Sequence, residues 1–299
     1  YYYDIKEEKN IIHSENELFN IPFSIKSYFN KNKSKIFSLL SSKQMKLKIE
    51  NELNYNNEKI IGKSQFIINK QKRYAQYQIE KKNFQFKIFD KEDEPSLVYN
   101  GKFNLKPFYA NLDANLDKIN LEYIIGSNSI IVQLLKTEIF NHKNIDFHLN
   151  INADNILNHV NFNNINLKSK IKEGLIDTDK TKFQWRSFAN FELSESLIFV
   201  REGELVLDGK LSITVNDYSE IYKFLLTPKN YRHKISKIDF NFTYNFDQKI
   251  AQLKDISIDN QINLNVNKIL NNIVLKKTDL QNKIYFKNLL NEAIKSYAG

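Results

Sequence analysis

The sequence lacks cysteine, and it contains only seven glycines and four prolines among 299 residues. Without cysteine there is no disulfide framework, thiolate nucleophile, zinc ribbon or iron–sulfur site. The few glycines and prolines exclude a collagen-like chain and a flexible linker. No apolar run reaches the roughly 18 residues of a membrane-spanning helix. The remaining composition, with 41% hydrophobic and 26% charged residues, is typical of a folded globular protein.

Arginine is also scarce, because only four of the 44 basic residues are arginine. The net charge of +9 therefore comes from lysine, and the chain is rich in asparagine and isoleucine as well. All three residue types have A/T-rich codons, so the base composition of the source genome accounts for the charge. Recognition of phosphates and base edges favours the guanidinium group of arginine. We therefore expect no nucleic-acid partner.

The single methionine, Met45, is internal, and the chain begins at Tyr1. We expect a further segment before Tyr1 in the full-length protein. A signal peptide or membrane anchor would lie in that segment.

Alternation of apolar and polar residues is the main pattern, and it is typical of strands with one buried face. The clearest examples are Ile145–Ile151 and Ile238–Phe246, and Leu205–Val215 is similar around a turn or bulge signal at Asp208-Gly209. Further candidates are Leu47–Tyr55, Tyr74–Ile79, Phe84–Phe89, Gly101–Leu105, Ala110–Leu116, Asn163–Ile171, Thr181–Trp185, Phe191–Leu193, Leu197–Arg201 and Ile262–Val266. Strands with one solvent-exposed face favour antiparallel pairing, because parallel sheets are usually covered on both faces. The sequence predicts an all-β protein, a single elongated unit over residues 1–299 whose curled, antiparallel or solenoid-like sheet has an apolar concave face.

Helical spacing occurs in four places: Asn120–Phe140, Tyr218–Leu226, Ile284–Tyr297 and, more weakly, Ser34–Gln44. Asp217 or Ser219 is the expected N-cap of the second helix. The helix at 284–297 carries one apolar stripe, made of Phe286, Leu289, Leu290, Ala293, Ile294 and Tyr297. We expect this helix to cap the end of the β structure.

Residues that could perform chemistry are few. The five histidines show no metal-ligand spacing, and His148 falls on the polar side of a strand. Acidic residues gather at Asp177–Asp179 and at Glu92–Glu94, where a solvated turn is the favoured interpretation over a calcium loop. No nucleophile motif or phosphate-binding loop is present. The sequence therefore predicts no catalytic residue, cofactor or metal site, and a protein that is not an enzyme.

Basic and aromatic residues interleave at Lys70–Phe84, as they do in single-strand nucleic-acid binders. The aromatics there also fit strand alternation, so solvated lysines at strand ends are the favoured interpretation. If this basic patch binds anything, anionic lipid is the expected target.

Short phrases over about residues 100–299 resemble a known family. They are Gly101–Leu105, Asn111–Asp117, the helical pattern at 121–140, Ile145–Ile151, Asn161–Ile165, Phe191–Leu197, Gly203–Gly209, Asn216–Phe224 and Asn288–Ala298. In order and layout they resemble the C-terminal region of AsmA-like proteins, the group that includes the TamB and YhdP types. No catalytic signature is part of this resemblance.

The resemblance implies a periplasmic envelope protein of a Gram-negative bacterium, anchored in the inner membrane by an N-terminal helix outside this chain. Such proteins support outer-membrane biogenesis and carry phospholipids along a hydrophobic β groove, so phospholipid acyl chains and other envelope proteins are the expected partners. The candidate groove residues are Leu205, Leu207, Ile213, Val215, Phe240, Phe242, Tyr244 and Phe246. A filled β-sandwich core would give the same alternation. The alternative function is an extracellular adhesin or carbohydrate-binding protein.

Overall fold

The computed structural model describes most of the chain as strand. The described residues are 2–5, 9–18, 21–30, 35–44, 46–56, 59–68, 71–89, 97–105, 108–126, 132, 135–136, 145–172, 175–271, 274–276, 278–279 and 282–298. They form 20 strands, and every pairing given below is antiparallel. The predicted all-β fold with mostly antiparallel strands is confirmed. Where the sequence predicts one elongated unit, the chain divides into two compact units, Tyr1–Asn115 (unit 1) and Leu116–Gly299 (unit 2).

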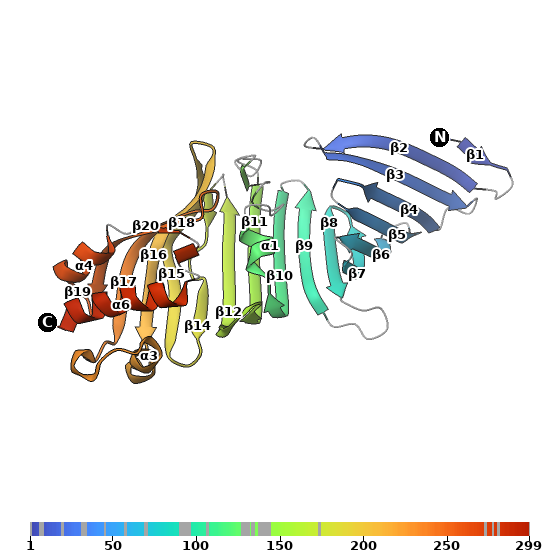
Figure 1. The fold of residues 1–299 in the computed structure, drawn as a ribbon. Helices are drawn as coiled ribbons and strands as arrows, with labels where there is room; N and C mark the ends of the chain where they lie inside the picture. Colours follow the sequence, from blue (N-terminus) through green and yellow to red (C-terminus); the bar gives the residue numbers. More distant parts are fainter. Residues whose placement is uncertain are drawn as a thin grey trace. The chain divides into compact units, whose positions relative to one another are not determined.

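Unit 1 is built from ten strands joined in sequence order (Figure 1). They are β1 (Tyr2–Asp4), β2 (Lys9–Leu18), β3 (Ile21–Asn30), β4 (Lys35–Ser42), β5 (Leu47–Asn56), β6 (Lys59–Ile68), β7 (Gln71–Glu80), β8 (Asn83–Phe89), β9 (Leu97–Leu105) and β10 (Phe108–Ile119), the last of which continues into unit 2. Each strand pairs with the next one along the chain, from β1 to β10. The described residues of unit 1 contain no helix.

The predicted helix at Ser34–Gln44 is wrong, because β4 occupies Lys35–Ser42. Ile36, Leu39 and Leu40 have helical spacing, but in a strand Ile36 and Leu40 lie on one face and Leu39 on the other. The strand pairs along its length with β3 and β5. Pairing on both sides therefore outweighs the local spacing.

The described residues of unit 2 add ten strands, four α-helices and a short 3₁₀-helix. Its elements are α1 (Leu121–Ile125), β11 (Ile145–Ile156), β12 (His159–Lys172), β13 (Leu175–Asp177), β14 (Lys182–Trp185), β15 (Ala189–Arg201), β16 (Glu204–Val215), α3 (Tyr218–Leu225), η2 (Lys229–Tyr231), β17 (Lys237–Asn245), β18 (Ile250–Ile258), β19 (Gln261–Ile262), α4 (Leu264–Leu270), β20 (Val274–Lys276) and α6 (Lys283–Ala298). β12 pairs with β11 on one side and with β13 and β14 on the other. β15 pairs with both short strands and begins the series β15–β16–β17–β18, which ends on β19 and β20.

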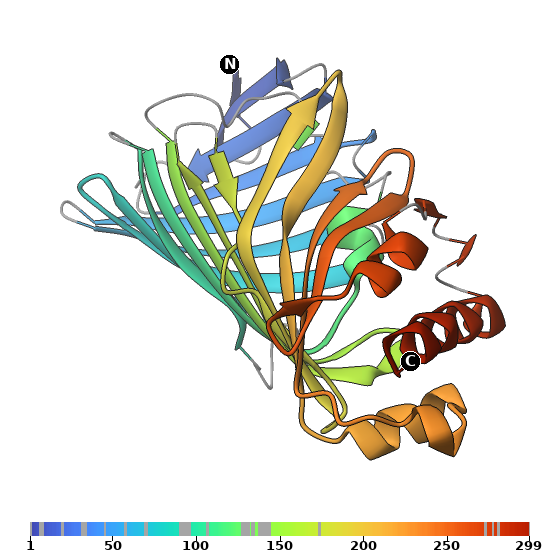
Figure 2. The ribbon, with the colours of Figure 1, turned by 90° about the vertical axis from the view of Figure 1, so that its left-hand side faces the viewer.

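The C-terminal helices cover one side of these strands, and α3, α4 and α6 lie on that side in Figure 2. The buried core between helices and strands consists of Tyr222, Ile235, Ile256, Ile258, Val266, Leu270, Leu275, Leu289 and Ala293. Ile294 and Tyr297 of α6 pack against it. α6 thus lies where the sequence predicts a helix at 284–297, and its Leu289 and Ala293 are the buried part of the predicted stripe. The side chain of Phe286 lies outside the described residues.

Two other predictions about helices need correction or restriction. Ile262–Val266 is not a single strand, because the Asn263 side chain accepts hydrogen bonds from the backbone N–H groups of Asn265 and Val266 and starts α4. Of the predicted helix at Asn120–Phe140, α1 is the first turn, and Gly126 ends it in an extended conformation. Most of the rest of that range lies outside the described residues.

Candidate functional site

One face of the unit 1 strands is lined with apolar side chains. We call it the apolar face, and the strand register places the following side chains on it: Phe23, Ile25, Phe29, Ile36, Leu40, Leu47, Ile49, Leu53, Ile60, Phe66, Tyr77, Ile79, Phe84, Phe86, Ile88, Tyr99, Phe103, Ala110, Leu112 and Ala114. Alternation along each strand produces this arrangement, since successive side chains point to opposite faces. The result is a set of apolar rows that crosses eight neighbouring strands.

The large side chains named above are half-buried. In the described part of unit 1, the buried hydrophobic residues are Ile11, Ala110 and Ala114, none of them on β3–β9. Tyr55, which lies opposite Ile60 on the same face, is 55% exposed. Since a single sheet needs a second layer to bury a face completely, the apolar face is accessible in the described residues.

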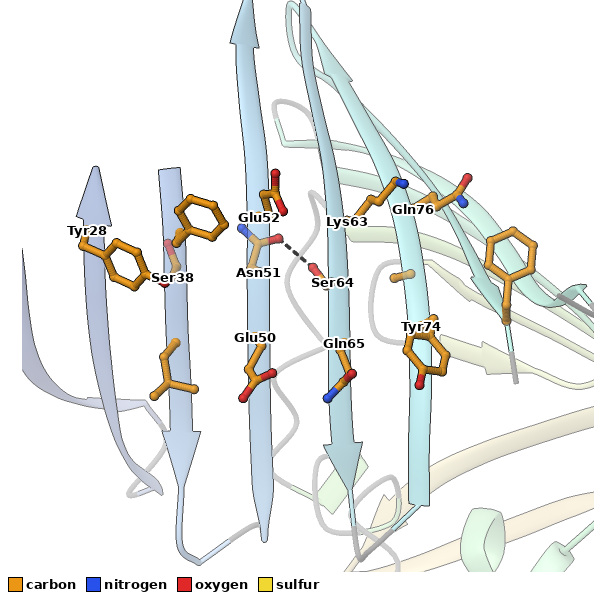
Figure 3. A pocket seen from close by; sticks show the side chains of 14 residues that line it. Tyr28, Ser38, Glu50, Asn51, Glu52, Lys63, Ser64, Gln65, Tyr74 and Gln76 are labelled. Atoms are coloured by element: carbon orange, nitrogen blue, oxygen red, sulfur yellow. Dashed lines mark hydrogen bonds between the residues drawn. The ribbon is translucent and has the colours of Figure 1, made fainter. Parts of the chain in front are cut away.

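A row of small polar residues crosses the middle of the apolar face. Ser27, Ser38, Asn51 and Ser64 stand directly opposite one another on β3 to β6. Ser27 donates a hydrogen bond to Ser38 at 3.0 Å. Ser64 donates to the Asn51 Oδ1 at 2.6 Å, as Figure 3 shows. The Tyr77 hydroxyl donates to the same Oδ1 at 2.7 Å. Side chains of the row thus satisfy part of their hydrogen-bonding capacity within the sheet.

Two glycines of this face are covered by aromatic rings from the neighbouring strand. Tyr77 lies directly opposite Gly62, and Phe86 lies directly opposite Gly101. A Cβ atom at Gly62 would come within 2.1 Å of the Tyr77 ring, and one at Gly101 within 2.7 Å of the Phe86 ring. The glycines therefore provide the space in which these rings lie flat.

Burial raises the pKa of the Tyr77 hydroxyl above its ordinary value, and the hydrogen bond to Asn51 opposes that rise.

Gly62→Ala is expected to lower the free energy of unfolding by about 1–3 kcal/mol, because the added methyl group displaces Tyr77 from Asn51. Tyr77→Ala in the same chain should remove most of that penalty. A double-mutant cycle measured by urea unfolding checks this, with an expected coupling of about 0.5–3 kcal/mol. Additive effects of the two substitutions would contradict the packing described above.

The groove residues predicted from the sequence lie on β16 and β17 or directly beyond β17, in unit 2. Leu207 pairs with Tyr244, and Leu211 with Phe240. Leu205 and Phe246 are 1% and 3% exposed, and they form a packed cluster with Val132.

The other predicted groove residues divide between two packed regions. Leu207 and Tyr244 pack against the cluster of Leu205 and Phe246. Val215 and Phe240 pack against the C-terminal helical core. Between the two regions, Phe242 lies opposite Gly209, and Ile213 is half-buried. The structure thus brings the predicted residues onto one face, and this face is covered at both ends. None of the groove residues predicted from the sequence lies in unit 1, although the alternation of β5, β7 and β8 is visible there.

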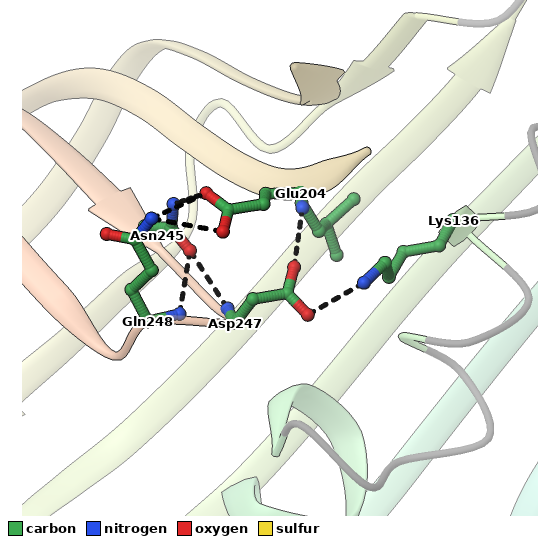
Figure 4. Close-up of polar contacts among 6 residues, drawn as sticks. Lys136, Glu204, Asn245, Asp247 and Gln248 are labelled. Carbon is green, nitrogen blue, oxygen red and sulfur yellow. Dashed lines mark hydrogen bonds and ion pairs between the residues drawn. The ribbon is translucent and has the colours of Figure 1, made fainter. Parts of the chain in front are cut away.

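A polar network holds part of this cover in place (Figure 4). The Asp247 carboxylate accepts hydrogen bonds from the Lys136 Nζ at 2.7 Å and from the backbone N–H of Leu205 at 2.9 Å. Burial alone would raise the pKa of Asp247, but the bonds from Lys136 and Leu205 lower it below its ordinary value. Glu204 accepts from Asn245 and Gln248 beside it. The network fixes Lys136, and with it the neighbouring Leu135, over the start of β16.

The acidic and histidine candidates have structural partners. The Asp179 Oδ1 accepts hydrogen bonds from the backbone N–H and the hydroxyl of Ser196, at 2.7 and 2.8 Å. His148 lies 2.8 Å from Asp146 on the same strand. Glu92–Glu94 lies outside the described residues. Among the residues that the structure describes, no three His, Asp or Glu side chains gather closely enough to hold a metal ion.

Comparisons with known proteins return no match. No protein family, curated protein or solved structure matches this chain. Within the described ranges, no helix combines the length and the hydrophobicity that crossing a membrane requires.

Proposed function

We propose that the apolar face of unit 1 binds the acyl chains of phospholipids. The observation that carries this proposal is an apolar surface over β3 to β10, crossed by the polar row on β3 to β6 and by Arg73 on β7, on which the named large side chains are only half-buried. Soluble proteins rarely leave a contiguous apolar surface of this kind without a ligand or partner. The chain acts as a binding protein without catalytic residues.

Acyl chains suit this surface because they need no hydrogen-bond partners. The backbone groups of β3 to β9 are already engaged by strands on both sides, and two pairs of the polar row are hydrogen-bonded to each other. Each buried methylene group contributes about 0.8 kcal/mol, so the binding energy grows with the length of chain that lies on the face. Contacts of this kind are not specific to one position, which allows a lipid to slide.

We further propose that the chain is the periplasmic part of an envelope protein of a Gram-negative bacterium, of the AsmA-like type. A segment before Tyr1 would anchor it in the inner membrane, and the protein would support phospholipid transport for outer-membrane biogenesis, with other envelope proteins as partners. The order of the phrases over residues 100–299 supports this proposal.

Site-specific photo-crosslinking in cells tests the proposal. A photoreactive residue at Ile49 is expected to capture phospholipid, identified by mass spectrometry. The matched control is the same residue at Glu50, which is adjacent on β5 and points to the opposite face. Equal capture at both positions, or no capture at Ile49, Leu53 and Phe86, would contradict lipid binding by the apolar face.

A further inference from the structure

The opposite face of unit 1 contains a hollow of about 610 Å³. Ten lining side chains belong to the polar face: Tyr28, Phe37, Leu39, Glu50, Glu52, Lys63, Gln65, Tyr74, Gln76 and Phe89. The other four lining residues, Ser38, Asn51, Ser64 and Ala75, lie between them on the same strands, and the strand register places their side chains on the apolar face. The hollow therefore spans β3 to β8 and is separated from the apolar face by the sheet itself (Figure 3).

Aromatic rings stand at two corners of this hollow. At one corner Tyr28 and Phe37 stack, with ring centroids 5.2 Å apart and an interplanar angle of 13°. At the other corner Tyr74 lies directly opposite Phe89 on the next strand. Phe37 is on β4 and Tyr74 on β7, so three strand spacings, about 14 Å, separate them across the strands, and an offset of two residues adds about 7 Å along the strands. Two aromatic corners at this separation suit a ligand of more than one ring.

The floor between the corners carries both hydrogen-bond donors and acceptors. Glu52, Lys63 and Gln76 form one row across β5 to β7, and Glu50, Gln65 and Tyr74 form a second row across the same strands. Glu52 pairs with Lys35 and keeps 41% of its side-chain surface exposed. Glu50 pairs with Lys48 and keeps 49% of its side-chain surface exposed. Both carboxylates can therefore still accept hydrogen bonds from a ligand.

We propose that this hollow binds a neutral oligosaccharide. A pyranose ring has an apolar C–H face that packs on an aromatic ring, and its hydroxyl groups both donate and accept hydrogen bonds. Lys63 and the two glutamines of the floor can donate hydrogen bonds to sugar hydroxyls, which an acyl chain cannot accept. Glu50 and Glu52 pair with Lys48 and Lys35, so the floor carries charges of both signs and favours a neutral polar ligand. The two faces of the same sheet thus take ligands of different chemistry.

Titration calorimetry of the full chain with cellotriose and with chitotriose tests the inference. We expect at least one of these trisaccharides to bind, and Phe37→Ala and Tyr74→Ala each to weaken its binding by about tenfold or more. Tyr109→Ala is the matched control, because Tyr109 is a half-buried tyrosine on the polar face of β10, outside the hollow. It should leave the affinity unchanged.

Two results would overturn the inference. One is the absence of binding by either sugar up to about 10 mM. The other is binding that both Phe37→Ala and Tyr74→Ala leave intact, which would place the sugar elsewhere. Circular dichroism of each variant verifies that the strands persist, and Lys63→Gln gives a milder variant that should also weaken binding. Lipid capture at Ile49 is measured separately, so the outcome for lipid does not decide the outcome for sugar.

Discussion

Phe246→Ala is expected to lower the free energy of unfolding of the chain by about 3–5 kcal/mol. The Phe246 side chain is 3% exposed and packs with Leu205 and Val132. Its ring also meets the Tyr244 ring edge to face, with centroids 5.0 Å apart. Truncation removes buried apolar surface and leaves a cavity between the strands and Val132. Urea unfolding followed by circular dichroism measures the loss.

Phe242→Ala is the matched control on the same face of the sheet. Phe242 is half-buried, lies opposite Gly209 and belongs to neither packed cluster. Its truncation should cost about 1–2 kcal/mol, because less apolar surface is removed from contact. Equal losses for the two variants would show that Phe242 is as deeply packed as Phe246.

Leu289→Asp is expected to destabilise unit 2 by several kcal/mol and to detach α6 from the strands. Leu289 is 7% exposed and belongs to the core that joins α4 and α6 to β18. A carboxylate at this position has no water and no cationic partner in the core, so its burial is unfavourable. Thermal melting and the protease sensitivity of the C-terminal residues report the detachment.

Asn288→Asp places the same charge one residue away, at an exposed position of α6. The melting temperature of this control should stay close to that of the unmodified chain. If Leu289→Asp melts at the same temperature as the control, α6 does not contribute to the core of unit 2.

Alternation predicted the class of fold well, because it reflects the geometry of a strand and needs no knowledge of distant residues. β17 is an example, since the pattern of Ile238–Phe246 alone indicates its two faces. Helices were harder to predict. The sequence around α4 alternates, yet a helix forms there for two reasons. The Asn263 side chain caps the start of the helix, and the buried amide of Asn267 bonds the backbone of Ile256. That amide bonds a strand eleven residues away, which local patterns do not reveal.

The candidate site was harder still. Alternation identifies which residues share a face, but not whether another element covers that face. Leu205 and Phe246 share a face as predicted, yet Val132 reaches them from more than seventy residues earlier in the chain. On β5 the same kind of pattern gives half-buried side chains. The difference in burial between the β16–β17 face of unit 2 and the apolar face of unit 1 arises from tertiary packing alone.

The sequential pairing of β1 to β10 means that each strand of unit 1 depends on its two immediate neighbours. In such a sheet, stability is close to a sum of contributions from single strands and adjacent pairs. A hairpin of about twenty residues could therefore be gained or lost during evolution while the register of the other strands is retained. Unit 1 is thus modular in length, and the area of both its faces would grow or shrink in steps of two strands.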